Sequence, residues 1–109
     1  MFTRSAPRSV AERRAAALAD AATELREDLR VLMRVTSPTP PERGRLGDAC
    51  RALASWAQNA GYGASAVHFA EAGAAVEPED AAAAFVAART NRVAGEGWRA
   101  ELYYIRAIR

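Results

Sequence analysis

A long run of regularly spaced small and aliphatic residues near the start of the chain most constrains its fold. Between residues 11 and 32 they recur at alternating steps of four and three, at Ala11, Ala15, Leu18, Ala22, Leu25, Leu29 and Leu32. This spacing places one apolar seam along a helix. Ser9 and Glu12 precede it as a capping box, in which each side chain accepts a hydrogen bond from the other residue's amide. We therefore expect a long N-terminal helix that ends near Val35, before the proline-rich segment 38–41.

Alanine extends the helical expectation beyond this first element. It fills 28 of the 109 positions, and no other residue has a higher intrinsic helix propensity. Thr39 and Glu42 form a second capping box, although Gly44 and Gly47 lead us to expect regular helix only from about Arg45. This second helix is predicted to end at Gly61 and to turn the following residues inward: Leu46, Ala49, Leu53, Trp56 and Ala60.

The remaining segments are less regular. Residues 64–72 and 98–109 carry features of both helix and strand, and we favour helix for both. The second of them has one helical stripe made of Trp98, Leu102, Ile105 and Ile108. Between them, Pro78, Glu79 and Asp80 indicate a new helix start, after which Ala81, Ala84, Phe85 and Ala88 are expected to face inward.

The predicted fold is accordingly all-α. We expect one domain over residues 1–109, a bundle of four to five helices with the long helix first. The alternative is an α+β fold with a small two-stranded sheet from residues 64–72 and 98–109. No internal repeat is apparent in the sequence beyond the alanine bias.

One segment resembles a bacterial helix-turn-helix. In residues 53–72 the small residue, the turn glycine and the branched aliphatic of that pattern are matched by Ala57, Gly61 and Val67. The resemblance implies DNA binding, with phosphate contacts from Arg43, Arg45 and Arg51. The exposed positions of the implied recognition helix would be residues 63–66 and 68, which offer few groups for hydrogen bonds to base edges.

Catalytic groups lack the partners that chemistry would require. His68 is the single histidine, and no acid is placed to orient it for Ser–His catalysis with Ser65. Cys50 is the single cysteine and lies on an apolar stripe, as a core residue would. The acids at 77, 79 and 80 suit a helix start better than a calcium loop. We therefore expect no catalytic, cofactor or metal site.

The arginines are segregated along the chain, and none occurs between residues 52 and 88. With 15 basic and 13 acidic residues the net charge is only +2, which does not demand a nucleic-acid partner. Arg99, Tyr103 and Arg106 are candidate contact residues, because arginine and tyrosine are common interface anchors.

The function expected from these features is a non-catalytic helical interaction module. It would be a small subunit, adaptor or inhibitor in a larger bacterial or phage assembly, with a protein partner or self-association. The alternative is a DNA-binding helix-turn-helix regulator, so nucleic acid is a possible partner. No apolar run is long enough for a membrane span. We expect a cytoplasmic protein that retains its opening residues 1–14.

Overall fold

The computed structural model describes residues 9–108, and these form five helices without a strand. The all-α prediction is confirmed for this range, and residues 64–72 and 98–107 are helical. Arg4, Arg8 and Arg109, with most of the opening segment that we expected to be retained, lie outside the described residues. The helices are α1 (Val10–Thr36), α2 (Pro40–Asn59), α3 (Gly63–Val76), α4 (Ala81–Val93) and α5 (Gly97–Ala107).

The first helix begins and ends close to the predicted positions. The Ser9 hydroxyl accepts from the Glu12 amide at 3.1 Å, as expected. The Glu12 carboxylate bonds the Ser9 hydroxyl at 3.2 Å, where the prediction had placed it on the Ser9 amide. The seam is buried only in its middle, at Ala22 and Leu29, whereas Ala11 and Leu32 are exposed. A 27-residue helix is about 40 Å long, and α3, on which it packs, spans only about 21 Å.

The second helix starts earlier than expected and buries a different face. Its capping box is complete at Thr39 and Glu42, and helix begins at Pro40 rather than near Arg45. Proline is tolerated in the first turn because the amides there need no intrahelical partner. Leu46 packs against the core as predicted, but the prediction was wrong for Leu53 and Trp56, which are 38% and 52% exposed. The buried residues are Gly47, Cys50, Ala54 and Ala57.

The size of the buried residues explains this difference. A face of alanine and glycine lets α2 lie close against α3, where larger side chains would hold the helices apart. Gly47 shows how close the approach is, because a Cβ there would overlap the carboxylate of Glu77. The same choice recurs in α4, where Ala83, Ala84, Ala87 and Ala88 are buried but Phe85 is 48% exposed, contrary to prediction.

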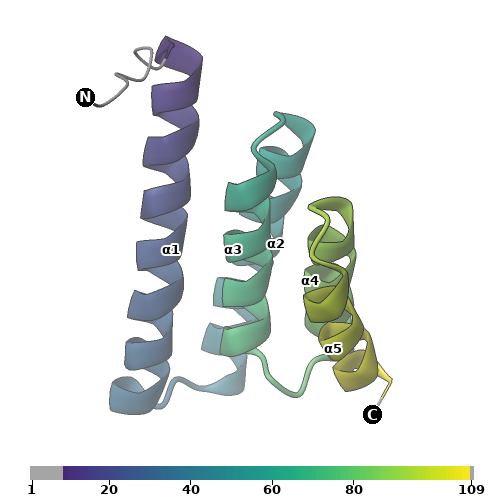
Figure 1. Cartoon of the computed structure of the whole chain (residues 1–109). Coiled ribbons are helices and arrows are strands. Elements are labelled where there is room, and N and C mark those ends of the chain that lie inside the picture. Colours follow the sequence, from purple (N-terminus) through teal and green to yellow (C-terminus); the bar gives the residue numbers. More distant parts are fainter. Residues whose placement is uncertain (1–8, 109) are drawn as a thin grey trace, which may run out of the picture.

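The helix α3 lies at the centre of the arrangement. It packs against α1, α2 and α4, and α5 packs on α4 (Figure 1). Ten of its fourteen residues are buried, more than in any of the other four helices. The chain alternates in direction, so that α1, α3 and α5 run one way and α2 and α4 the other (Figure 1).

Two turns of the structure share one geometry. The turns α2–α3 and α4–α5 match at positions 34 residues apart. Gly61 has φ 85° and Gly95 has φ 84°. The amide of Tyr62 bonds the Ala57 carbonyl at 2.8 Å, and the amide of Glu96 bonds the Asn91 carbonyl at the same distance. The two turns are therefore built on one plan, a glycine-ended helix C-cap, although the helices that they join differ in length.

Candidate interaction surface

The outer side of α5 carries the largest gathering of exposed apolar side chains among the described residues of the α4–α5 hairpin. Trp98, Leu102, Ile105 and Ile108 are 66%, 59%, 44% and 85% exposed. Their predicted stripe exists, but it faces away from the core, whereas Ala100 on the same helix is buried. Phe85 of α4 lies beside them through an edge-on contact with Tyr104, with ring centroids 5.8 Å apart. We call these five exposed residues, Phe85, Trp98, Leu102, Ile105 and Ile108, the α5 face.

Three predicted contact residues adjoin this face. Arg99, Tyr103 and Arg106 line a shallow hollow of about 250 Å³ together with Trp98 and Leu102. Arg106 lies over the Tyr103 ring at 5.7 Å, and Arg99 lies over the Trp98 ring at 5.8 Å. Burial raises the pKa of the Tyr103 phenol, so it stays protonated at neutral pH. The sequence thus located residues of one continuous hollow.

The guanidinium groups of this hollow are directed back into the chain. Arg106 donates to the carbonyl of Ala74 at 2.6 Å and so caps the end of α3. Arg99 donates to the carboxylate of Glu71 at 2.6 Å. Because both cations have partners inside the molecule, the hollow presents their aliphatic stems and the aromatic rings.

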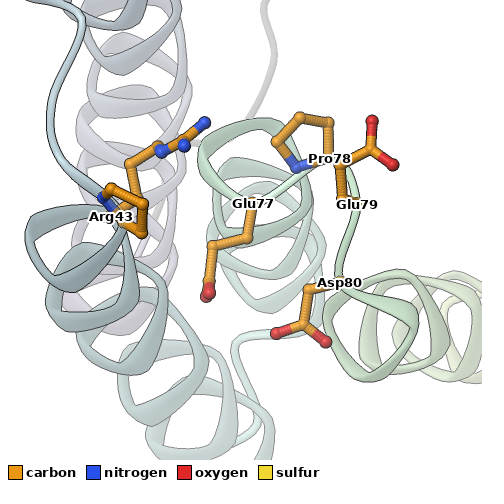
Figure 2. Close-up of a pocket in the computed structure, with 6 residues that line it drawn as sticks. Arg43, Glu77, Pro78, Glu79 and Asp80 are labelled. Atoms are coloured by element: carbon orange, nitrogen blue, oxygen red, sulfur yellow. The ribbon is translucent and has the colours of Figure 1, made fainter.

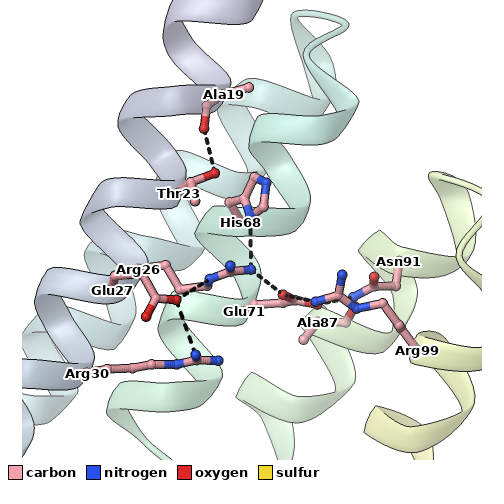
Figure 3. Close-up of polar contacts among 10 residues, drawn as sticks. All are labelled: Ala19, Thr23, Arg26, Glu27, Arg30, His68, Glu71, Ala87, Asn91 and Arg99. Carbon is pink, nitrogen blue, oxygen red and sulfur yellow. Dashed lines mark hydrogen bonds and ion pairs between the residues drawn. The ribbon is translucent and has the colours of Figure 1, made fainter.

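The carboxylate of Glu71 is the centre of a buried polar network (Figure 3). Its side chain is 1% exposed and accepts from Arg26 of α1 at 2.9 Å as well as from Arg99. Asn91 of α4 donates to the second carboxylate oxygen at 3.1 Å. One acid on α3 therefore binds α1, α4 and α5 together.

His68 belongs to the same network. Its Nδ1 lies 3.0 Å from Nη1 of Arg26. Burial, with the neighbouring Arg26 charge, lowers the pKa of His68, which favours the neutral imidazole with Nδ1 as acceptor. Sequence reasoning missed the network, although a lone acid in the otherwise apolar stretch 69–76 was a signal for it.

The other three predicted contact residues lie on α2. Arg51 is held by Glu77 at 3.0 Å and by Asp48 at 2.5 Å. Arg43 lines a hollow of about 280 Å³ whose other side is acidic, with Glu77, Glu79 and Asp80 (Figure 2). Arg45 is exposed. The structure therefore does not join these three arginines into one basic patch.

Of the three acids of that hollow, only Asp80 has the helix-start role that we predicted, since Glu77 ends α3 and pairs with Arg51. Asp80 is the N-cap of α4 and accepts from the amides of Ala82 and Ala83 at 2.8 and 3.3 Å. Within residues 9–108 no cluster of three or more potential ligands is arranged to hold a metal ion. In the same range, no helix combines the length and the apolar character needed to cross a membrane.

The segment that resembles a helix-turn-helix occupies the end of α2 and most of α3. Its second helix would have to enter the major groove of DNA. In this structure Ser65 and Ala66 are buried, and α3 is enclosed by α1, α2 and α4. The helix thus offers DNA only Gly63, Ala64 and part of His68.

Comparisons with known proteins give no relative: no family model, no curated protein and no solved structure matches this chain.

Proposed function

We propose that the chain is a non-catalytic helical interaction module and that the α5 face is its contact surface. The observation that carries this proposal is the contrast between an interior of alanines and an exterior helix with four large apolar residues. Exposed apolar surface of this extent marks interaction sites on soluble proteins. The aromatic and arginine side chains of the adjoining hollow are of the types enriched at binding hot spots.

The repeated turn supports the same proposal. The glycines of the two turns lie 34 residues apart, which is the period of tetratricopeptide repeats, one kind of solenoid repeat that stacks to form extended binding surfaces. Stacked repeats need a polar outer face at each end to remain soluble alone. The outer helix here exposes four large apolar residues instead, so a further layer of protein would stabilise it.

The reactive residues support a non-catalytic function. Cys50 is 3% exposed, and burial raises the pKa of its thiol, which disfavours the nucleophilic thiolate. His68 is held by Arg26, and Glu71 is held by two arginines. A cytoplasmic subunit or adaptor of a larger bacterial or phage assembly remains our proposal for the setting of this surface.

Site-specific photocrosslinking tests the proposal. A photoreactive amino acid replaces Leu102 on the α5 face or, as a matched control, Val35, which is 75% exposed on α1. Both proteins are irradiated in the cells that produce them. We expect a discrete adduct from position 102 and none from position 35. Equal labelling at both positions, or no adduct at position 102, would refute the α5 face as the contact surface.

A further inference from the structure

Half of the α5 stripe is the surface at which a further helix would stack if the pattern of the chain continued. Counting 34 residues back from Ile105 and Ile108 gives Glu71 and Ala74 of α3, which are buried at 2% and 0% exposure. The same count from Trp98 and Leu102 gives Ala64, which is exposed, and His68, which is half-buried. Ile105 and Ile108 themselves have no such cover within the described chain.

The exposed area of this face suits a pair of molecules. Taking about 200 Å² for a large apolar residue, the exposed fractions of its five residues leave on the order of 600 Å² open. Two such faces together would remove about 1,200 Å² from water, which is the lower end of the range for specific interfaces. One α5 face on each of two molecules therefore supplies enough area for a specific dimer interface.

The charges around the face also permit a second copy. Arg99 and Arg106 flank it, but their guanidinium groups already bind Glu71 and the Ala74 carbonyl. Closing two copies together therefore buries no unpaired arginine, which would otherwise cost several kcal/mol. Glu101 is the single carboxylate that the α5 helix carries among the described residues; it is exposed and lies on the stripe, one helical turn from both Trp98 and Ile105, so a second copy brings two carboxylates near the seam.

We infer that the occupant of the α5 face is the α5 face of a second copy of this chain, related by a two-fold axis. The apolar positions 98, 102 and 105 are spaced by four and three, so two α5 helices can interdigitate along one seam. A two-fold arrangement uses the same patch on both molecules and closes at a dimer. This inference rests on the proposed function and names its partner.

Sedimentation equilibrium of the purified full chain between about 1 and 200 µM tests the inference. We expect a reversible dimer of 11.7 kDa subunits. Leu102→Glu and Ile105→Glu place a charge in the seam and should each raise the dissociation constant about 30-fold or more, as loss of a hot spot does. Val35→Glu puts the same charge on α1 and should leave it unchanged. Glu101→Gln removes like-charge repulsion and should lower it severalfold.

Each outcome decides the matter. A monomeric wild-type chain up to 200 µM, or a dimer that Leu102→Glu leaves intact, overturns the second copy as occupant. Circular dichroism shows that each variant keeps its helices, and Ile105→Cys adds a separate check: oxidation should link two chains, because the native Cys50 is buried. The photocrosslinking distinguishes the two proposals. An adduct at position 102 of any mass other than twice the chain keeps the contact surface but refutes self-association.

Discussion

The helices α3 and α5 occupy the same place in their hairpins and have opposite surroundings. In α3 most residues are small, and ten of fourteen are buried. In α5 the apolar residues are larger, yet only Ala100 is fully buried. Position in the stack thus decides burial here, and several of the largest apolar residues are left outside. In α3 small size is useful because three helices pack closely against it, whereas α5 packs on α4 and reaches α3 through the long side chains of Arg99 and Arg106.

The largest expected effect is the loss of folding stability when Glu71 is replaced, an acid that has no counterpart on α5. Glu71→Ala leaves Arg26, Arg99 and Asn91 without their shared partner in the interior. Removing one member of a buried charge network costs about 3–5 kcal/mol, so urea unfolding should show a loss of that order. Glu79→Ala, at an exposed position of the α3–α4 loop, should stay within about 0.5 kcal/mol. Similar losses in the two variants would contradict a network that holds three helices.

The packing of α3 gives the next effect. Ala66→Leu inserts a larger side chain at a position with 0% exposure, among Ala54, Ala57 and Ala22, and should destabilise the fold by about 1–3 kcal/mol. Ala64→Leu, two residues earlier on the exposed side, is the matched control and should stay within about 0.5 kcal/mol. Leu102→Ala on α5, measured in dilute protein, should also change the free energy of unfolding by no more than about 0.5 kcal/mol. A costly Leu102→Ala would mean that α5 is packed like α3.

These two contrasts also show where the sequence was and was not informative. The helices, their caps and the first seam follow from local rules, which neighbouring residues satisfy by themselves. The buried faces of α2 and α4 do not follow from local rules. Their alanine face and their face of larger apolar residues recur with the same helical period, so the spacing alone cannot tell which one is buried. Only the tight fit against α3 favours the smaller one, and that fit is a property of the assembled helices.

The contact role of three residues on α5 stays a prediction. Arg99, Tyr103 and Arg106 were chosen by residue type, and they do lie around one hollow. Their inward hydrogen bonds to α3 could not be predicted, because Glu71 and Ala74 are about 30 positions away in sequence. The exposure of the apolar stripe on α5 likewise could not be predicted from the stripe itself. The stripe faces solvent because no other helix among the described residues covers it.

The turns sharpen the claim that the two hairpins are equivalent. Gly61 and Gly95 both have positive φ, which costs any other residue about 1–2 kcal/mol. Gly61→Ala and Gly95→Ala should therefore destabilise by equal amounts, within about 0.5 kcal/mol of each other. Gly63→Ala serves as the control, because Gly63 begins α3 without a positive φ and has open space around it, so alanine there should be neutral or stabilising. Unequal losses at the two turns would show that the hairpins differ in how they are stabilised.

The smallest expected effect is a loss of folding stability at low pH through His68 of α3. The equivalent position on α5 is Leu102, which does not titrate. The pKa of His68 is lowered by burial and by Arg26, so between its ordinary value near 6.5 and that lower value the unfolded chain binds a proton that the folded chain does not. Stability conferred by the neutral imidazole is complete above pH 6.5 and declines as the pH falls. Urea midpoints at pH 7.5 and 5.5 should show this decline in the wild type and less of it in His68→Gln, whose amide oxygen can still accept from Arg26.

Glu42 does not interfere at pH 5.5, because hydrogen bonds from Thr39 hold its pKa below the usual range. An identical decline in His68→Gln would assign the pH dependence to groups other than this network.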